Sequence, residues 1–472
     1  MPRSAAPRRR TPTSSRPSPR RWTRSRKAWS SSPEGNSDAT VTQQFAYIIH
    51  LLRKILRCST SSGDEVSSLA GRALRRRPLP GHLSCMTVVA RESTPPDALR
   101  LIETQEEFER VCLAARRARE VAVDTEAASF HRHRDRIYLL QLSTSEQTVV
   151  VDPLAVTDLA AFGAVLADRD VEVVFHDADY DLRLLDLEHG FRATNVFDTR
   201  IAAQLLNEPG IGLAALLEKY LGVRLDKRFQ RADWSARPLS PPMLAYAATD
   251  THYLLALRDI LRERLRERGR LAWALEEFET LERVRWALPQ ADDEPGFLRL
   301  KGAKALKGQA LALVKALYEW RESVAERTDR AAFRILNNET LLAMAKDPPA
   351  TLEALAQVRG VGPDFVARRG KDVLKVLQKA LALPPEQWPA LPRRQRGKPD
   401  PEFEARLDRL KVARNALAAR LDLAPGVLCP NGTLEAIARA LPASVEELAA
   451  IPDVRRWQVA EFGPALLAAL AG

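Results

Sequence analysis

The chain has 472 residues, too many for one ordinary domain, so we expect about two to four domains. Hydrophobic residues make up 45% of it and charged residues 28%, as in globular proteins. No stretch approaches the roughly 18 uninterrupted apolar residues of a membrane span, which argues against a membrane protein. Four cysteines without a CxxC pair argue against a zinc site or a disulfide framework and indicate a reducing, cytoplasmic environment.

The net charge of +11 is unevenly distributed along the chain. Residues 1–85 carry a balance of +13 and are rich in Arg, Ser and Pro, without a sustained apolar period. We expect this extension to be disordered. It is either a basic arm for nucleic acid or an overextended gene start with translation beginning at Met86, and we favour the second interpretation.

Short apolar segments alternate with amphipathic ones from Leu99 to about Leu298, a pattern typical of an α/β domain. The predicted strands are 120–124, 137–143, 147–152 and 172–175. The predicted helices are 105–117, 157–167, 178–189, 198–206, 212–220 and 241–268. Beyond residue 299 no strand pattern remains, and short helices are expected.

The helical region contains an internal repeat. A shift of 93 residues aligns ETLLAMAKDPPATLEALA (339–356) with GTLEAIARALPASVEELA (432–449), and it also aligns Arg321 with Arg414. Residues 381–402, between the copies, are rich in Pro and Arg and cannot form one continuous helix. We therefore expect two copies of one helical module joined by a linker.

Charge separates these regions. Residues 86–298 sum to −10, residues 299–380 to +7, the linker to +1 and residues 403–472 to zero. An acidic α/β domain is thus followed by one basic and one neutral helical module.

Two carboxylates interrupt a strand that is otherwise predicted to be buried. Asp124 and Glu126 follow the apolar run 121–123, and residues two apart point to the same face of a strand. Like charges in one small patch raise each other's pKa unless a cation lies between them. For this pair alone, a strand end at the surface is an equally simple interpretation.

Two further segments carry acidic residues. VVFHDADYDLRLL (173–185) places Asp181 early in a helix that follows a strand. YAATDTHYLLAL (246–257) places Tyr246 and Asp250 four residues apart, on one face of one helix. Alone, such a pair usually lies on a solvated face.

Together the three segments resemble the motifs of the DEDDy 3′–5′ exonucleases, namely Asp-x-Glu, His-x-Ala-x-x-Asp and Tyr-x-x-x-Asp. NVFDTRIAAQLLN (195–207) and FQRADWSARPLSPPMLAYAATD (229–250) resemble the ribonuclease D family, and the helical repeats resemble HRDC domains. The resemblance runs from about residue 97 to the end, without a departure at a catalytic position. It implies a ribonuclease H-like α/β exonuclease domain followed by two all-α HRDC-like domains.

The resemblance also implies domain boundaries. The expected division is a basic extension (1–85), a DEDDy exonuclease domain (97–298), a first HRDC domain (299–380), a Pro/Arg-rich linker (381–402) and a second HRDC-like domain (403–472).

Four carboxylates in one cleft are hard oxygen ligands that suit two Mg²⁺ or Mn²⁺ ions. Ions roughly 4 Å apart would clamp the scissile phosphate, one activating water and the other stabilising the leaving 3′ oxygen. The resemblance implies that Asp124 bridges both ions, with Glu126 and Asp250 on the nucleophile side and Asp181 on the other. Tyr246 would orient or deprotonate the water, and orientation is the simpler role because a free phenol has a pKa near 10.

Residues outside the acidic positions have two interpretations each. His176 is expected to be a structural hydrogen-bonding group. Phe130 and Trp234 are candidates for stacking on a terminal base, but core packing explains them equally well. The basic residues of the first repeat are either phosphate contacts or a solvated helix face, and the candidates are Lys301, Lys304, Lys307, Arg368, Arg369 and Lys371.

The predicted function is a 3′–5′ exoribonuclease that trims structured RNA, such as tRNA precursors, and acts as a monomer. One alternative is a DNA exonuclease of the Werner type, since DNA helicases also carry HRDC domains. A catalytically silent nucleic-acid-binding protein is the other, and the presence of all four carboxylates argues against it.

Overall fold

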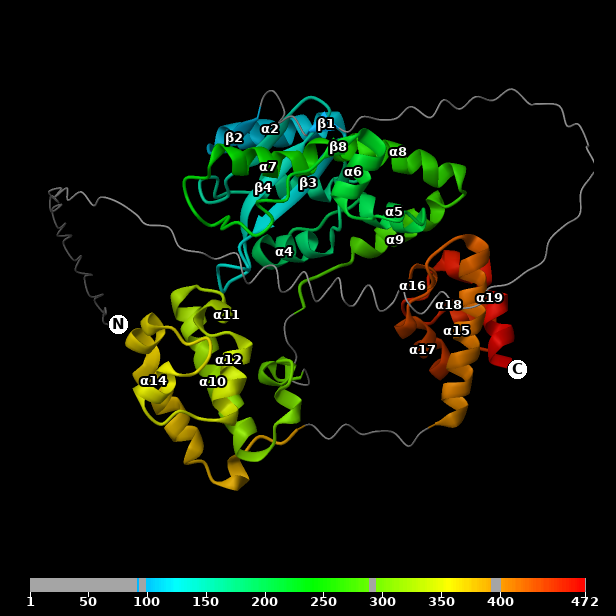
Figure 1. Ribbon diagram of the computed structural model, residues 1–472. Coiled ribbons are helices and arrows are strands. Elements are labelled where there is room, and N and C mark those ends of the chain that lie inside the picture. The colour runs from blue at the N-terminus through cyan, green and yellow to red at the C-terminus, as the bar shows by residue number, and fades with distance from the viewer. Residues whose placement is uncertain (1–90, 93–98, 288–293, 392–399, 472) are drawn as a thin grey trace, which may run out of the picture. The chain divides into compact units, whose positions relative to one another are not determined.

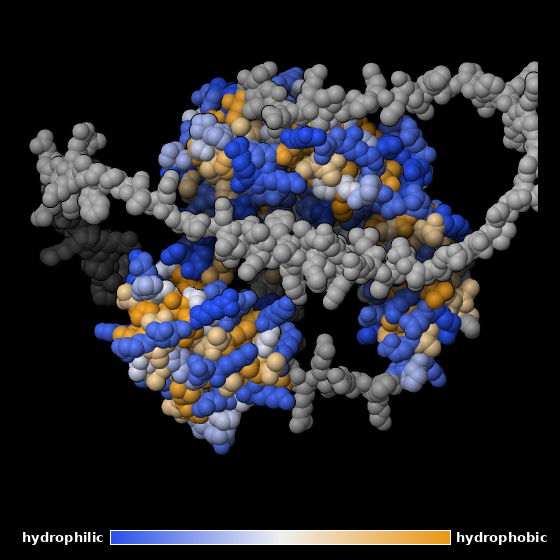
Figure 2. Space-filling view, viewed as in Figure 1, coloured by the Kyte–Doolittle hydropathy of each residue, from blue (hydrophilic) through white to orange (hydrophobic). Residues whose placement is uncertain are grey.

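The computed structural model (Figure 1) describes residues 91–92, 99–287, 294–391 and 400–471. The predicted basic extension, 1–85, lies outside these residues. No helix among the described residues is both long and apolar enough to cross a bilayer. Hydrophilic side chains cover most of the face of the described chain that Figure 2 shows.

A six-stranded mixed sheet forms the centre of the catalytic unit (Figure 1). Its strands, in spatial order, are β2 (Arg100–Ile102), β5 (Thr148–Val151), β4 (Ile137–Ser143), β3 (Glu120–Ala127), β6 (Glu172–Phe175) and β7 (Val196–Asp198). Strand β3 pairs antiparallel with β4 and parallel with β6. A two-stranded parallel sheet joins β1 (Arg91–Glu92) to β8 (Val223–Arg224). The α/β prediction is confirmed.

Both faces of the large sheet are covered by helices, which explains why β3 and β6 are apolar on both sides. Val121 and Val123 pack in one hydrophobic cluster, whereas Ala122 packs in another. The first cluster includes side chains of α2 (Gln105–Ala118), α3 (Ala160–Ala167) and α4 (Asp179–His189). The second includes α5 (Thr199–Leu205), α6 (Leu213–Leu221), α8 (Leu254–Glu267) and α9 (Leu271–Leu281).

The prediction of one long helix at 241–268 is wrong in one respect, because this segment forms two helices. Helix α7 (Pro241–His252) ends at Tyr253, where α8 begins. The Thr249 hydroxyl donates a hydrogen bond to the Ala245 carbonyl at 2.7 Å, a contact that often bends helices. Strands β2 and β7 were not predicted, since a three-residue strand is too short to show a period. Helix α9 was not predicted either.

The helical repeat is confirmed, because the same five helices occur twice in the same order. The first copy contains α10 (Gly308–Thr328), α11 (Ala332–Ile335), α12 (Asn338–Lys346), α13 (Leu352–Ala356) and α14 (Pro363–Leu381). The second contains α15 (Pro401–Leu421), α16 (Pro425–Leu428), α17 (Asn431–Ala440), α18 (Val445–Ala449) and α19 (Arg456–Ala471). Three 3₁₀ turns (296–299, 303–305 and 385–387) flank the first copy.

Each copy contains one buried arginine that ties its helices together. Arg321 donates to the Asn338 side chain at 2.6 Å, and Arg414 donates to the Asn431 side chain at 2.7 Å. The two pairs occupy equivalent positions of the repeat. A buried arginine needs such acceptors, because an unpaired buried charge is strongly unfavourable. The shared Arg and Asn positions are therefore structural.

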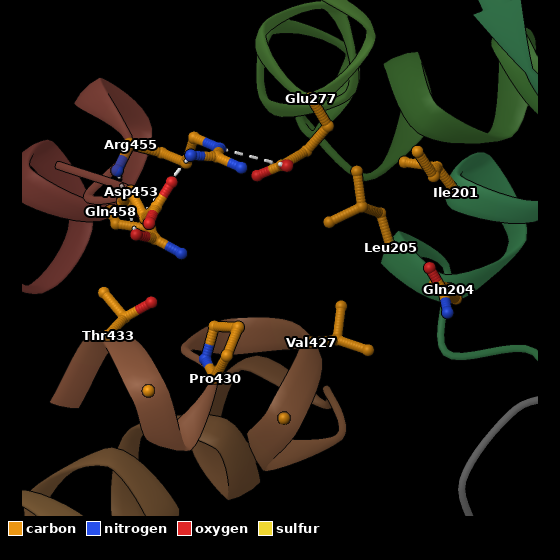
Figure 3. Close-up of a pocket in the computed structure, with 12 residues that line it drawn as sticks. Ile201, Gln204, Leu205, Glu277, Val427, Pro430, Thr433, Asp453, Arg455 and Gln458 are labelled. Carbon is orange, nitrogen blue, oxygen red and sulfur yellow. Dashed lines mark hydrogen bonds and ion pairs between the residues drawn. The ribbon is translucent and has the colours of Figure 1, made fainter. Parts of the chain in front are cut away.

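The second copy shares a hydrophobic cluster with the catalytic unit. The rings of Trp273 and Trp457 stack with centroids 4.6 Å apart. Glu277 accepts a hydrogen bond from the Trp457 ring at 2.9 Å and forms an ion pair with Arg455 at 3.1 Å. Figure 3 shows the pocket of about 520 Å³ beside this contact, with Glu277 and Leu205 facing Arg455. Residues 401–471 are thus packed onto the exonuclease fold.

A buried arginine also joins α8 to the sheet. Glu120 on β3 and Glu172 on β6 are in register, so their carboxylates lie side by side. Arg258 on α8 forms ion pairs with both, and it reaches the Glu120 carboxylate at 2.6 Å. Arg262 on the same helix forms a further ion pair with Glu172, so two guanidinium groups face the two neighbouring negative charges.

Replacing Arg258 by methionine should destabilise the protein by about 3–5 kcal/mol, because Glu120 and Glu172 would remain side by side with only the Arg262–Glu172 ion pair to offset their charges. Arg266→Met on the same helix is the matched control. Its ion pair with Glu263 is exposed, so the expected loss is below about 0.5 kcal/mol. Urea unfolding measures the free energy of unfolding of both variants. Equal losses would show that the buried ion pairs of Arg258 contribute no more stability than the exposed ion pair of Arg266.

Candidate active site

The two acidic residues of β3 lie where the strand passes the end of its parallel neighbour. Strand β6 pairs with β3 only as far as Ala122, whereas β4 continues alongside to Ala127. Asp124 pairs in register with Gln141 of β4, and Glu126 with Leu139. Both carboxylates are half-buried and lie at an open edge of the sheet.

The third motif contributes from α7, above the same face. One carboxylate oxygen each of Asp124, Glu126 and Asp250 lies within 4.8 Å of the other two. Tyr246, one turn before Asp250, lines the same pocket as Asp124. Two segments that are far apart in the sequence thus converge, as the motifs predict.

Asp181 reaches the site from the beginning of α4. Its Oδ1 accepts hydrogen bonds from the Thr125 backbone N–H at 3.2 Å and from the Thr125 hydroxyl at 2.5 Å. That backbone N–H is available because β6 has already ended. Thr125 was not singled out in the sequence, although its position between the two acids of the first motif could have indicated it.

The carboxylates cannot all be charged in the absence of a cation. Burial raises the pKa of Asp124 and Glu126 well above the ordinary range, and the neighbouring carboxylates raise it further. Burial also raises the pKa of Asp181 and of Asp250 to about 7. The pKa of Tyr246 is raised too, by burial and then by Asp250, so its phenol stays protonated at neutral pH.

This donor set suits a divalent metal ion. Carboxylate oxygens are the ligands that Mg²⁺ and Mn²⁺ prefer, and three of them already lie within reach of one ion at Asp124, Glu126 and Asp250. A divalent cation would replace the protons that these groups otherwise hold. The residues present therefore fit a metal centre.

A pocket of about 420 Å³ adjoins the acidic residues. It is lined by Asp124, His176, Tyr246 and Asp250, and by Lys227, Gln230 and the first residues of α6. Sequence reasoning missed Lys227 and the α6 N-terminus, because no motif marks them. Free backbone N–H groups at a helix N-terminus and a lysine are suitable partners for a phosphate or sugar oxygen.

The three candidate side chains with aromatic rings lie in different environments in the structure. Trp234 is 1% exposed and packs beside Tyr246, so the core interpretation is confirmed. Phe130 is 47% exposed, with the Arg231 guanidinium 5.4 Å from its ring centre. His176 lies 2.9 Å from the Thr199 hydroxyl, and burial lowers its pKa to about 4, as expected for a structural, neutral group.

The predicted phosphate contacts of the first repeat lie on its surface, apart from the half-buried Arg369, but they are not equally available. Lys304 forms an ion pair with Glu294 at 2.7 Å, and Arg368 forms one with Asp364 at 3.4 Å. Lys301 and Lys307 form no salt bridge with any residue in the described ranges. Lys301 and Lys307 therefore have more capacity for a phosphate than Lys304.

The first repeat contacts the segment that follows the first motif. Asp329 accepts hydrogen bonds from the backbone N–H groups of His133 at 3.2 Å and Arg134 at 3.3 Å. The Ala331 N–H donates to the His131 carbonyl at 3.1 Å. The basic module is thus in contact with the catalytic unit near the exposed Phe130.

Comparison with known proteins agrees with this geometry. The sequence model of the 3′–5′ exonuclease family matches residues 99–266, and that of the HRDC domain matches residues 310–377 and 403–470. The crystal structure of Escherichia coli RNase D, described as an exoribonuclease involved in structured RNA processing, superposes with a TM-score of 0.58 at 25% identity. The superposition covers 79% of this chain and 99% of that chain.

The fold and the acidic site define a 3′–5′ exonuclease with HRDC domains. The ribonuclease D of Gluconacetobacter diazotrophicus is 33% identical over 377 residues, which are 79% of this chain and 93% of the relative. The ribonuclease D of Granulibacter bethesdensis is 33% identical over 373 residues, which are 78% of this chain and 91% of the relative. The chain belongs to the ribonuclease D family, and its activity is that of a 3′–5′ exoribonuclease acting on RNA.

Without metal, the protein should lose stability as the pH rises from about 4 to about 7. Folded Asp250 keeps its proton up to a pKa of about 7, whereas an unfolded aspartate titrates near 3.9. The folded state binds more protons between these values, so the free energy of unfolding falls with rising pH. Thermal unfolding in EDTA at pH 5 and pH 8 measures this, with Asp250→Asn as the comparison. The wild-type midpoint should fall more between the two pH values, and identical slopes would contradict the assignment.

Proposed function

We propose that the exoribonuclease activity depends on two divalent ions, Mg²⁺ or Mn²⁺, held by the four carboxylates. The observation that carries this proposal is the convergence of Asp124, Glu126 and Asp250 within 4.8 Å, with Asp181 fixed by Thr125 beside them. Asp124 would contribute to both ions, Glu126 and Asp250 would hold the ion on the nucleophile side, and Asp181 would hold the other. Such a pair of ions would activate the attacking water and stabilise the leaving 3′ oxygen.

The protein residues then have separate tasks in the reaction. The Tyr246 hydroxyl, on the pocket wall beside Asp250, orients the attacking water by hydrogen bonding. Lys227 and the α6 N-terminus, on the pocket wall, bind the terminal nucleotide. Trp234 packs beside Tyr246 and holds the phenol in place. Thr125 orients Asp181 toward the second ion.

The proposed substrates are the 3′ ends of structured RNA, with tRNA precursors as the leading candidates. Support comes from the ribonuclease D family and from the structured-RNA processing of the E. coli relative. The acidic catalytic unit does not attract RNA over a long range, whereas the first repeat, at +7, does. We also propose that the protein acts as a monomer in the cytoplasm. Family membership favours this function over a DNA exonuclease or a silent binding protein.

We also propose the division of the chain into an exonuclease domain (97–298), a first HRDC domain (299–380), a linker (381–402) and a second HRDC-like domain (403–472). The ranges of the family matches support it. Residues 1–85 would be an extension outside the catalytic protein.

Asp124→Asn should abolish RNA degradation and leave the thermal midpoint in EDTA unchanged or higher, because it removes like-charge repulsion from a metal-free site. The assay is release of 5′-nucleotides from single-stranded RNA with Mn²⁺. Single-stranded DNA in parallel tests the alternative substrate. A folded Asp124→Asn protein with near-normal turnover would contradict the two-metal proposal.

Tyr246→Phe keeps the ring that packs against Trp234 and removes only the hydroxyl. We expect turnover to fall at least about tenfold, but less than in Asp124→Asn, because the metal centre still activates water. Single-turnover kinetics with saturating enzyme measures this step. Unchanged turnover would remove Tyr246 from the reaction.

Replacing Lys301, Lys304 and Lys307 together by alanine should weaken RNA binding and flatten its salt dependence, because fewer counterions are released. Lys304 should contribute least, since Glu294 already neutralises it. The measurement is the Kd for single-stranded RNA at several salt concentrations, with the Asp124→Asn background preventing degradation.

The matched control replaces Lys411, Arg420 and Arg439 of the second repeat, which has no net charge. It should change the Kd and the salt slope little. Substitution is a cleaner control than deletion of 403–472, because deletion would expose Trp273 and the shared hydrophobic cluster. If the control weakens binding and the first triple variant does not, the roles of the two repeats are reversed.

A further inference from the structure

A buried amide lies beside the metal centre without a hydrogen-bond partner. Gln141 on β4 is 0% exposed. Neither its Nε2 nor its Oε1 has a hydrogen-bond partner among the described residues. Leaving a buried polar group unpaired costs free energy, and such groups are rare in folded proteins. An apolar residue of the same size would fill this position at lower cost, so the amide calls for an explanation.

The strand register places this amide opposite a metal ligand. Gln141 pairs directly with Asp124 in the antiparallel β3–β4 ladder. Side chains of such a pair project from the same face of the sheet, with Cβ atoms about 5 Å apart. A glutamine side chain is long enough to bring its amide to the carboxylate of that neighbour. No strand residue intervenes between the two.

Other polar groups on that face are already occupied. Ser143, two residues further along β4, forms hydrogen bonds with Thr148 at 2.9 Å and with Thr251 at 2.8 Å. Thr148 in turn lies 2.8 Å from the His252 ring. This hydroxyl network includes no contact with Gln141. The Asp124 carboxylate is therefore the acceptor best placed for the amide.

We propose that Gln141 is a positioning residue for the metal centre. Its Nε2–H donates to the Asp124 carboxylate when that carboxylate holds a cation, and the bond fixes the orientation of the ligand. Partners of this kind commonly change metal affinity 10- to 100-fold. The inference rests on the proposed metal dependence. It also gives the unpaired Nε2 of Gln141 a hydrogen-bond partner in the metal-bound protein.

The test is Gln141→Met, which keeps the size of the side chain and removes the donor. The thermal midpoint in EDTA should be unchanged or higher, because an unpaired buried amide is lost. The affinity for Mn²⁺, titrated calorimetrically without RNA, should fall about 10- to 100-fold. Gln141→Leu should behave the same way and serves if the methionine variant does not fold.

Gln458→Met is the matched control, because Gln458 is a buried glutamine whose amide is fully bonded. It is 4% exposed, donates to the Leu428 carbonyl at 2.9 Å and accepts from the Arg455 N–H at 3.0 Å. This variant should lower the thermal midpoint and leave Mn²⁺ affinity unchanged. Replacing Gln141 should therefore lower only the Mn²⁺ affinity, whereas replacing Gln458 should lower only the thermal midpoint.

An unchanged Mn²⁺ affinity in Gln141→Met would overturn the inference, whatever the stability of the variant. If its midpoint is also lower, as in the control, Gln141 has a structural role. The Asp124→Asn variant distinguishes a failure of the Gln141 inference from a failure of the proposed metal dependence. If wild-type protein binds no Mn²⁺, or Asp124→Asn binds it equally well, the metal proposal fails, whereas Mn²⁺ binding that depends on Asp124 but not on Gln141 removes only Gln141.

Discussion

Electrostatic repulsion among buried carboxylates is the constraint on which the rest of this structure depends. Burial raises the pKa of Asp124, Glu126, Asp181 and Asp250, and for Asp124 and Glu126 the neighbouring carboxylates raise it further. Only protons or cations make such a group stable. At neutral pH a divalent ion is the better partner, since the pKa of Asp181 and of Asp250 lies near 7. The site is therefore organised for a metal before any substrate is present.

The surrounding fold holds these charges in place. Strand β3 extends past the end of β6, and the unpaired Thr125 N–H then fixes Asp181. Helix α7 supplies Asp250 and Tyr246 from one face. Strand β4 runs along the other edge of β3, and there Gln141 pairs directly with Asp124. Away from the site, Arg258 and Arg262 form ion pairs with the other acidic pair of the sheet, Glu120 and Glu172.

Much of this was predictable from the sequence, because the signals are local. The two-residue spacing of Asp124 and Glu126 and the four-residue spacing of Tyr246 and Asp250 place each pair on one face, whatever the fold. The 93-residue repeat indicated two equivalent helical modules. Thr125, Lys227 and the packing of Trp457 against Trp273 were not predictable, since they depend on contacts between distant segments. The break between α7 and α8 has no Gly or Pro to mark it.

The central claim is that the four carboxylates form one two-ion metal centre. Anomalous diffraction from crystals soaked in Mn²⁺ tests it directly, without reference to activity. We expect two peaks roughly 4 Å apart, one among Asp124, Glu126 and Asp250 and the other between Asp124 and Asp181. A site that binds no manganese at saturating concentration, or manganese bound only elsewhere on the protein, would contradict the account.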